Sequence, residues 1–423
     1  MFKDYGNITS GEEEKASLPL HLPTTSNSII ALVFGAYHAI ELSKPFLAWS
    51  LSSKASELCQ SLGYHRATPV DQDTAEDVQL KRLLFWTTYF IDKSLSLRLG
   101  RATTIPDWTI TTPRPSVTDP HQQPVMAYFV LWVETARCQG NIYEMLYSPD
   151  ATAQPVHVLQ ARVQRLVTDL QDLEKATVMT NRRWLQHAKD KSGDDLLDFF
   201  ASSDETLRLS LLTLVYRAAP HTGSTATFNA DCVRAARATL DSHKNCVAIM
   251  GSSSRAFAPT YFQWTILFAP FVPYIVIFCH VIETQDEADL QRLGDFVASM
   301  EPAAHSSEAT SKTHGLFQAL YDIAFRCTEL RTMSNECGRG SGDPHMDWFL
   351  ESVGIVTSGQ EMGGEQTHVS GSLNSFDMAT ESAAHGARNS SEAENHHDGL
   401  RALACMGHEA ELEAWLHNNE FMP

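Results

Sequence analysis

The segment from Glu76 to Leu99 constrains the fold more than any other part of the chain. Large apolar side chains recur along its whole length and on almost every side of a helical wheel, at positions 80, 83, 84, 85, 86, 89, 90, 91, 95, 97 and 99. A helix that is apolar all round is expected at the centre of a helical body and not on its surface. Gly100 ends this helix, because glycine readily adopts the left-handed conformation that follows helix C-termini, and Pro106 prevents it from resuming.

The predicted buried helix also carries charged side chains that need partners: Arg82, Asp92, Lys93 and Arg98. A buried charge without a partner is strongly destabilising, so each must find an opposite charge or a set of hydrogen bonds. Arg101 and Asp107, just beyond the helix, are the candidate partners. We interpret this group as structural ion pairs, and the alternative is a polar pocket for a small effector.

Helical periodicity and turn residues predict further helices on both sides of this one. Pro45 starts a helix that ends before Gly63, and residues 108–112, which lie between prolines, are expected to be extended loop. The other predicted helices cover residues 29–40, 125–147, 156–173, 207–219, 228–250, 266–282, 290–297 and 316–330. Strand signals are nearly absent. The sequence therefore predicts an all-α fold, a multi-helix bundle-like single large domain.

Residues 266–282 form the most hydrophobic run in the chain, and the run is barely long enough to span a bilayer. Pro270 and Pro273 lie inside it, His280 lies near its end, and no basic flank sets an orientation. We interpret the run as a buried helix started by proline.

Composition divides the chain into four parts. Residues 1–28, with an acidic run and two prolines, are predicted to be a flexible arm, and residues 29–335 the helical domain. Residues 336–399 are rich in Gly, Ser, Glu, His and Asn, too polar to bury a core, and are predicted to be a disordered linker. Residues 400–423 follow as a short acidic amphipathic segment.

Large apolar side chains return in the segment 400–423. Leu412, Trp415 and Leu416 fall on one face of a short helix, while Glu409, Glu411, Glu413 and Glu420 lie among them. Such a segment is too short to be stably helical alone, but it can fold onto a hydrophobic groove with basic residues, as acidic activation segments do. The alternative is that it docks on the chain's own helical domain.

Charge and motif content narrow the classes of function. A net charge of −19 repels phosphate backbones and disfavours direct DNA binding by this chain. The eight cysteines are scattered without a C-x-x-C pair and no signal peptide precedes them, so reduced intracellular thiols are expected. No G-x-S-x-G, H-E-x-x-H or Walker motif occurs, and His65-Arg66 at a helix end is interpreted as compensating the helix dipole. We therefore assign no catalytic, cofactor-binding or metal-binding residue.

Three ordered segments carry a resemblance to a known family. They read A-x-x-L-C-x-x-L-G-Y-H-R from Ala55 to Arg66, R-L-L-F-W-T-T-Y-F-I-D-K-S-L-S-L-R-L-G-R from Arg82 to Arg101, and I-P-D-W-T-I-T-T-P-R-P from Ile105 to Pro115. Together they resemble the middle homology region of fungal binuclear zinc-cluster transcription factors, the fungal-specific transcription factor domain. A looser match is W-T-I-L-F-A-P-F-V-P-Y-I-V-I-F-C-H-V-I from Trp264 to Ile282. The resemblance spans about residues 29–335.

The resemblance implies a nuclear regulator of fungal RNA polymerase II genes, with a metabolic or secondary-metabolite gene cluster as one possible target. It implies partners in the transcription machinery, homodimers or heterodimers with related regulators, and no membrane. Members of this family carry a basic six-cysteine zinc module before the middle region, but no cysteine precedes Cys59 here. We therefore expect zinc and direct promoter binding only if such a module lies outside this sequence.

Two alternatives from other classes stay open. One is an interaction protein, deficient in DNA binding, that sequesters or dimerises with a full-length relative. The other is a helical enzyme whose catalytic residues do not form a recognisable motif.

Overall fold

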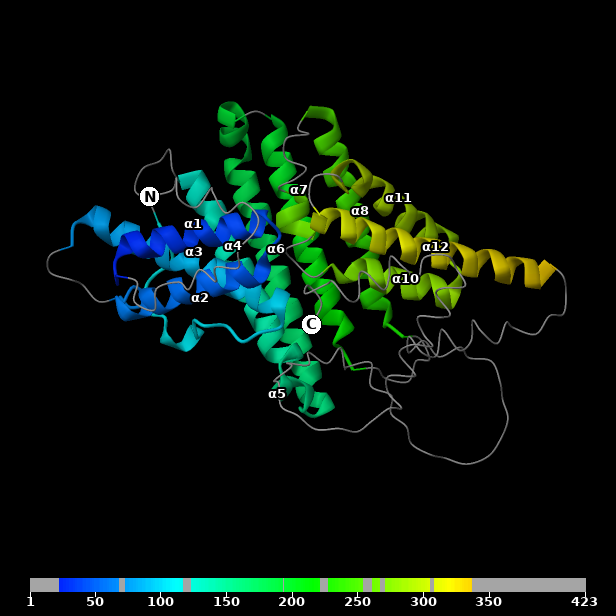
Figure 1. Ribbon diagram of the computed structural model, residues 1–423, viewed down its shortest axis with the longest axis horizontal. Coiled ribbons are helices and arrows are strands. Elements are labelled where there is room, and N and C mark those ends of the chain that lie inside the picture. The colour runs from blue at the N-terminus through cyan, green and yellow to red at the C-terminus, as the bar shows by residue number, and fades with distance from the viewer. Residues whose placement is uncertain are drawn as a thin grey trace, which may run out of the picture.

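The computed structural model describes residues 23–67, 73–116, 123–192, 194–220, 227–253, 261–266, 271–304 and 308–336 (Figure 1). The elements in chain order are α1 (Ser26–Glu41), α2 (Pro45–Ser61), α3 (Ala75–Leu99), the 3-10 turn η2 (Asp107–Thr109), α4 (Gln123–Ile142), the π-turn η3 (Tyr143–Tyr147), α5 (Pro149–Thr152), α6 (Val156–Ser192), α7 (Asp194–Arg217), α8 (Ala230–Ser253), the π-turn η5 (Phe262–Ile266), α10 (Val272–Thr284), α11 (Glu287–Ala304) and α12 (Glu308–Glu336). No strand occurs in these ranges. The predicted all-α fold is confirmed.

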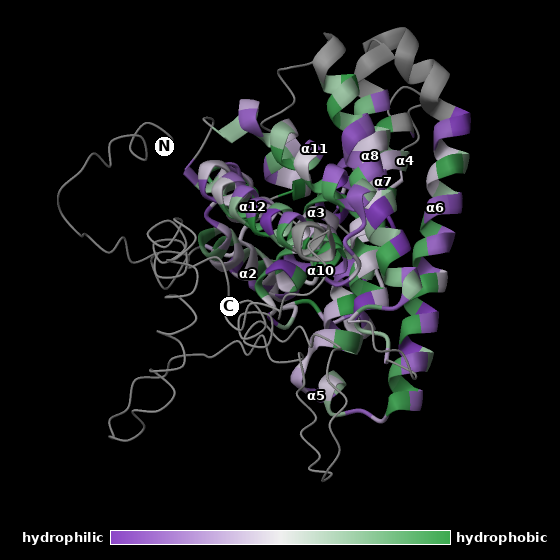
Figure 2. Ribbon diagram, turned by 90° about the vertical axis from the view of Figure 1, so that its right-hand side faces the viewer, coloured by the Kyte–Doolittle hydropathy of each residue, from purple (hydrophilic) through white to green (hydrophobic). Residues whose placement is uncertain are grey.

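The helices pack around three clusters of buried apolar side chains that follow one another along the molecule. The first lies among α1, α2 and α3, the second among the end of α3, α4, α6 and α7, and the third among α7, α8, α10, α11 and α12. Figure 1 shows the same sequence of layers, with α1–α3 at one end and α10–α12 at the other. Figure 2 shows the long helix α6 along one edge.

Two contacts join the N-terminal helices to the later part of the chain. The Ser43 hydroxyl donates to the Gln263 side-chain carbonyl oxygen at 2.7 Å, across 220 residues of sequence. The rings of Tyr37 and Trp264 lie 5.2 Å apart, and Trp264 packs against the cluster of α1, α2 and α3. The π-turn η5 therefore contributes to the apolar cluster of α1, α2 and α3.

The two ends of α3 are set by its sequence. Thr74 caps the N-terminus, since its hydroxyl accepts from the Asp77 amide while the Asp77 carboxylate accepts from the Thr74 amide. Gly100 ends the helix with φ 58°, as predicted. The prediction that the helix is buried on every side is wrong for its first turns, where Leu80 and Leu83 are 42% and 39% exposed. Burial is nearly complete only from Leu84 onward, and there it includes polar side chains.

Two other predicted helices were too short. The helix predicted over 156–173 continues to Ser192, and the one predicted over 207–219 starts at Asp194. The expected extended loop over 108–112 begins instead with the 3-10 turn η2, in which Trp108 is 87% exposed.

The hydrophobic run 266–282 is a buried helix, as predicted, but it begins later. α10 starts at Val272 with Pro273 in its first turn, and its side chains from Tyr274 to Ile282 are mostly buried. Among the helices described, none combines the length and the apolar character that crossing a membrane requires.

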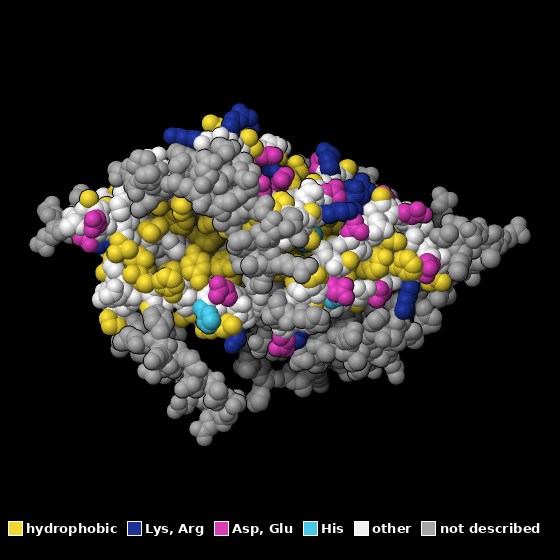
Figure 3. All heavy atoms as spheres, turned by 90° about the horizontal axis from the view of Figure 1, so that it is seen from above, with side chains coloured by type: hydrophobic (Ala, Val, Ile, Leu, Met, Phe, Trp, Pro, Cys, Tyr) yellow, Lys and Arg dark blue, Asp and Glu magenta, His cyan; other side chains and the backbone are white. Residues whose placement is uncertain are grey.

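Figure 3 shows apolar side chains gathered on the part of the surface above the N-terminal helices. The exposed ones in these helices include Phe34, Leu42 and Leu47. The predicted linker from 337 to 399, the segment 400–423 and the first 22 residues of the predicted arm lie outside the described residues.

Candidate functional site

Residues 101–116, here called the return segment, fold back along α3. Thr103 bonds to Asp92, which lies seven residues before the end of the helix, and the carbonyl of Pro113 bonds to Trp86, two turns earlier. Successive residues of the return segment thus meet successively earlier turns of α3. The prolines that prevent the helix from resuming also keep this segment close to an extended course.

Because the return segment runs back along α3, α4 follows the same direction as α3. Arg114 lies over the ring of Trp86 and also bonds Glu134, whereas Ser94, two turns further along α3, donates to Gln139 at 2.6 Å. The motif stretches 82–101 and 105–115 therefore form one packed unit with α4.

Asp92 is the most completely enclosed charge of this unit, with 0% exposure. Its carboxylate accepts from the Thr104 hydroxyl at 2.6 Å, from the Thr104 amide at 3.1 Å, from the Ile105 amide at 3.3 Å and from the Thr103 hydroxyl. Hydrogen bonds to the ionised form offset the cost of removing it from water. The expectation that Arg101 balances Asp92 is therefore wrong, because hydroxyl and amide dipoles of the return segment do so.

Lys93 is paired with Asp107, one of the two candidate partners that the sequence offered. The Lys93 ammonium lies 2.8 Å from the Asp107 carboxylate and 5.3 Å from the centre of the Tyr89 ring, and the Tyr89 hydroxyl donates to the same carboxylate at 3.1 Å. Burial, followed by the negative charge of Asp107, raises the pKa of Tyr89 well above its ordinary value. Gly140 of α4 leaves room for the lysine stem, since a Cβ there would lie 2.5 Å from Lys93 Cδ.

Trp86 connects the same unit to a surface ion-pair chain. Its indole N–H donates to the Pro113 carbonyl at 2.8 Å, and the Arg114 guanidinium lies 3.9 Å from the ring centre. Arg114 and Arg137 each donate to one oxygen of Glu134, at 2.6 and 2.8 Å. The return segment is thus fixed to α3 by an indole hydrogen bond and to α4 by a carboxylate.

The remaining predicted ion pairs are not formed. Arg101 lies over the rings of Trp49 and Phe46, at 4.6 and 5.1 Å. Burial lowers the pKa of Arg98 to about 10. The Arg82 Nε is buried and has no hydrogen-bond partner among the described residues. The structural interpretation is correct for Asp92 and Lys93. Arg101 instead lies over two aromatic rings, and Arg82 and Arg98 form no ion pair in the part of the chain that the structure describes.

The His65-Arg66 pair behaves differently from a pair of dipole-compensating cations. Arg66 Nε donates to His65 Nε2 at 3.1 Å, so that ring nitrogen carries no proton. Burial, with the adjacent Arg66 charge, lowers the pKa of His65. Its carbonyl accepts from the amides of Thr111 and Thr112, at 2.9 and 3.1 Å, and ties the end of α2 to the return segment.

A second charged cluster, which the sequence did not indicate, joins α8, α10 and α11. Asp289 is 0% exposed and accepts from Arg237, at 2.7 and 2.9 Å, and from Arg292 at 2.9 Å. His280, Asp286 and Asp289 offer ligand atoms within 4.8 Å of one another, a spacing that a metal ion could use. However, Arg237 already lies 3.0 Å from Asp286 and 3.2 Å from His280. The two guanidinium groups supply the positive charge, so the cluster is an ion-pair network.

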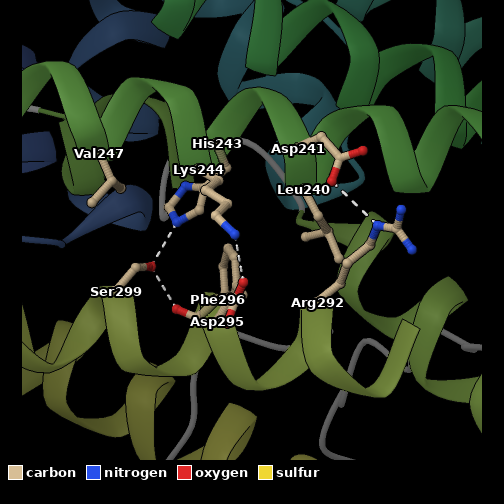
Figure 4. A pocket seen from close by; sticks show the side chains of 9 residues that line it. All are labelled: Leu240, Asp241, His243, Lys244, Val247, Arg292, Asp295, Phe296 and Ser299. Atoms are coloured by element: carbon tan, nitrogen blue, oxygen red, sulfur yellow. Dashed lines mark hydrogen bonds and ion pairs between the residues drawn. The ribbon is translucent and has the colours of Figure 1, made fainter. Parts of the chain in front are cut away.

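A buried hydrogen-bond chain lies beside this network (Figure 4). The Ser299 hydroxyl donates its proton to the Phe296 carbonyl, so it can only accept from His243 Nε2, at 2.7 Å. Because His243 Nε2 is the donor of the neutral ring, His243 Nδ1 accepts from the Tyr261 hydroxyl at 2.7 Å. Burial lowers the pKa of His243 to about 3 and raises that of Tyr261. This hydrogen-bond chain links α8, α11 and Tyr261, the residue that precedes η5. It fixes the His243 ring in one neutral tautomer.

The cavity beside this hydrogen-bond chain suits water better than an organic effector. The cavity in Figure 4 has a volume of about 70 Å³ and is lined mainly by α8 and α11, with Asp241–Arg292 and Lys244–Asp295 pairs at its mouth. Drug-sized ligands occupy pockets of roughly 300–1,000 Å³ with mostly apolar walls. A second space of about 440 Å³ between α11 and α12 is an open polar groove that contains Gln291, Glu301 and His314.

Two further groups have shifted pKa values. Burial raises the pKa of the thiols of Cys59, Cys138, Cys232, Cys246 and Cys279 to about 12. These thiols stay protonated and are poor nucleophiles. Burial raises the pKa of Asp204 in α7 to about 7, against the hydrogen bond that it accepts from the Trp132 indole at 3.1 Å.

Comparison with known proteins finds a family model that covers α3 and the return segment. Residues 7–127 match the family described as fungal specific transcription factor domain. The lactose regulatory protein of Kluyveromyces lactis is 40% identical over 78 residues, which cover 18% of this chain and 9% of that protein. An uncharacterized transcriptional regulatory protein of Schizosaccharomyces pombe is 26% identical over 311 residues, which cover 67% of this chain and 47% of that protein.

A third relative, a negative regulator of pleiotropic drug resistance of Candida glabrata, is 24% identical over 159 residues, or 36% of this chain and 16% of that protein. The matched part of this chain thus spans less than half the length of each of these relatives. No solved structure matches the chain.

Proposed function

We propose that this chain, whose residues 7–127 match the fungal specific transcription factor domain, regulates RNA polymerase II transcription in a fungus and acts in the nucleus as a regulator and not as a catalyst. The observation that carries the proposal is the unit made by α3, the return segment and α4. The motif residues Trp86, Asp92, Lys93 and Asp107 all bond within this unit. The resemblance therefore rests on residues that hold one another in place, and not on composition alone.

The target genes belong to small-molecule metabolism in this proposal. One relative is named as a lactose regulatory protein and another as a negative regulator of pleiotropic drug resistance. Both names concern the response to small molecules, which favours targets of that class, with a metabolic gene cluster as the narrower version. Transcript profiling of a strain that lacks this chain is the test. A change confined to one set of metabolic genes supports the proposal, and unchanged transcripts under all growth conditions contradict it.

The chain acts through protein partners and reaches promoters indirectly. Its net charge of −19 opposes close approach to DNA, which carries a negative charge about every 1.7 Å of helix axis. Partners in the transcription machinery, a second copy of the chain or a related zinc-cluster regulator are consistent with this charge. Zinc belongs to this proposal only if a six-cysteine zinc module lies outside this sequence.

The same charge favours a second candidate function, in which the chain sequesters or dimerises with a full-length relative. Immunoprecipitation of a tagged chain, followed by analysis of bound proteins and of bound promoter DNA, separates the two. Promoter DNA recovered through a co-regulator supports the regulator. Recovery of a zinc-cluster relative, with that relative lost from its promoters, supports sequestration.

In this proposal the chain has four parts with different roles: an arm at 1–28, the helical domain at 29–335, a linker at 336–399 and an activation segment at 400–423. Fused to an unrelated DNA-binding domain, residues 400–423 are expected to drive a reporter, and Trp415→Ala with Phe421→Ala to abolish that activity. A fusion that is expressed normally but inactive would contradict the activation role. For localisation, imaging a tagged chain that stays outside the nucleus under all conditions would contradict the nuclear assignment.

A further inference from the structure

The hairpin of α1 and α2 exposes a group of large apolar side chains. Phe34 on α1, Leu42 in the turn, and Phe46 and Leu47 on α2 are between 38% and 63% exposed. Figure 3 shows apolar side chains gathered over this end of the molecule. Exposed groups of this kind mark surfaces at which a protein meets a partner.

Arg101 lies at one edge of this surface and has no acid to pair with. Its guanidinium lies over the rings of Phe46 and Trp49, and it forms no ion pair or side-chain hydrogen bond in the part of the chain that the structure describes. Its backbone is held at the end of α3, because its amide donates to the Ser96 carbonyl at 2.9 Å. The planar fork of N–H groups is therefore positioned before any partner binds, and such a fork suits a carboxylate.

Glu41 lies at the other edge of the same surface. It is the last residue of α1 and directly precedes Leu42, whereas Arg101 contacts Phe46 in the first turn of α2. Among the described residues its ion-pair neighbour is His38, at 3.9 Å, and both side chains are largely exposed. A surface pair of this kind contributes little, so the Glu41 carboxylate is available to a partner.

A surface with this arrangement is complementary to itself. Rotation by 180° about an axis through its centre exchanges the two edges, so the guanidinium of each copy meets the carboxylate of the other. The apolar side chains near the axis then cover their own counterparts. The four exposed apolar residues, with Glu41 and Arg101 at their edges, are here called the hairpin face.

We propose that the hairpin face binds the hairpin face of a second copy of this chain, with Arg101 of each copy paired with Glu41 of the other. The second copy supplies both the acid that Arg101 lacks within its own chain and a cover for the exposed apolar side chains. A second copy is among the partners in the proposed function, but the contact does not rest on a role in transcription. Purified protein is enough to test it, so the two proposals can fail separately.

The size of the hairpin face predicts a reversible dimer. α1 has 16 residues and α2 has 17, so their outer side is about 25 Å long and about 20 Å wide. Two such faces bury about 1,000 Å² in all, which lies at the low end for specific complexes and is typical of transient ones. We expect a micromolar dissociation constant that increases with salt, because the Arg101–Glu41 pairs lie at the rim.

Sedimentation velocity of the full-length chain over a range of concentrations tests the proposal. Arg101→Glu and Glu41→Arg are each expected to raise the dissociation constant about tenfold or more, since each places like charges opposite one another. The double variant, Arg101→Glu with Glu41→Arg, restores opposite charges and should return the constant to within about threefold of wild type. Arg165→Glu is the matched control, since Arg165 is exposed on α6, which packs against α4 and α7, and it should leave the constant unchanged.

Two of the variants keep the test independent of the fold around α3. Glu41 is exposed at the C-terminal end of α1, where a positive charge also suits the helix dipole, so Glu41→Arg should unfold at the wild-type temperature. Leu47→Ser removes an exposed apolar side chain from the hairpin face and should also weaken the dimer. If Arg101→Glu does not fold, these two variants still decide the outcome.

Four results would overturn the proposal. A wild-type chain that stays monomeric up to about 0.1 mM would leave the hairpin face to a different partner. A dimer that neither single reversal weakens would place the contact elsewhere on the molecule. A double variant no tighter than the single ones would show that Arg101 and Glu41 do not pair. An equal loss in Arg165→Glu would show a general effect of charge.

Discussion

The ammonium of Lys93 lies 2.8 Å from the carboxylate of Asp107, and the two side chains differ sharply in exposure, 2% against 40%. The charge of a buried lysine is thus compensated by a carboxylate that reaches the surface of the molecule. Removing one partner of a buried pair leaves the other charge unpaired, which costs more than the intact pair contributes.

The Lys93–Asp107 pair predicts unequal effects from its two partners. Asp107→Asn is expected to lower the free energy of unfolding by about 2 kcal/mol, below the usual figure for a buried pair because Asp107 reaches solvent. Lys93→Met removes the charge itself and fills a similar volume, so its expected cost is under about 1 kcal/mol. Urea denaturation followed by circular dichroism measures both. Equal losses in the two variants would show that the lysine is not the dependent partner.

The burial of Trp86 predicts a large loss of stability on truncation. Trp86 is 1% exposed and donates to the Pro113 carbonyl, so Trp86→Ala is expected to cost about 3–5 kcal/mol. Trp108, which is 87% exposed, is the matched control, and Trp108→Ala is expected to stay within about 0.5 kcal/mol of wild type. A Trp86→Ala protein that melts within a degree or two of wild type would contradict the central position of α3.

The raised pKa of Asp204 predicts a loss of stability with rising pH. Its pKa goes from 3.8 to about 7 on folding, so between these values the folded state holds a proton that the unfolded state has released. The free energy of unfolding contributed by this group therefore falls as pH rises from about 4 to 7. Asp204→Asn, which can still accept from Trp132, should match wild type near pH 4 and exceed it by about 4 kcal/mol at pH 8. A constant difference across this range would show that Asp204 is ionised in the folded chain.

His243 predicts the opposite pH dependence. Its pKa falls from 6.5 to about 3 on folding, so the unfolded state binds a proton between these values and the folded state does not. Its contribution is fully present above pH 6.5 and is lost as the pH falls towards 3, at about 1.4 kcal/mol per pH unit. His243→Gln retains a donor and an acceptor without titrating, and its unfolding free energy should change less steeply between pH 4.5 and 6.5. Identical slopes for variant and wild type would exclude a buried neutral histidine.

The sequence predicted those parts of the fold that local signals determine. The end of α3 follows from Gly100, and Asp107 was a candidate partner because a buried charge such as that of Lys93 needs one. Sequence could not predict that Asp92 is satisfied by Thr103 and Thr104, because that requires the course of the return segment in space.

Helix length and long-range clusters were predicted least well. The sequence of α6 after Leu173 carries fewer apolar residues than the part before it, so the pattern did not mark Ser192 as its end. Arg237 and Asp289 meet across 52 residues, and neither residue carries a local sign of the other. Only packing of α8 against α11 brings them together.

The bond between Ser43 and Gln263 has a consequence for synthesis of the chain on the ribosome. The unit of α3, the return segment and α4 closes between residues close in sequence, so it can form as soon as α4 has emerged. The core around α1 cannot be completed then, because its partners in η5 are made 220 residues after Ser43. During that interval Tyr37 and Ser43 lack the partners that η5 supplies, and a nascent chain would be most exposed to aggregation or to a chaperone before Gln263 leaves the ribosome.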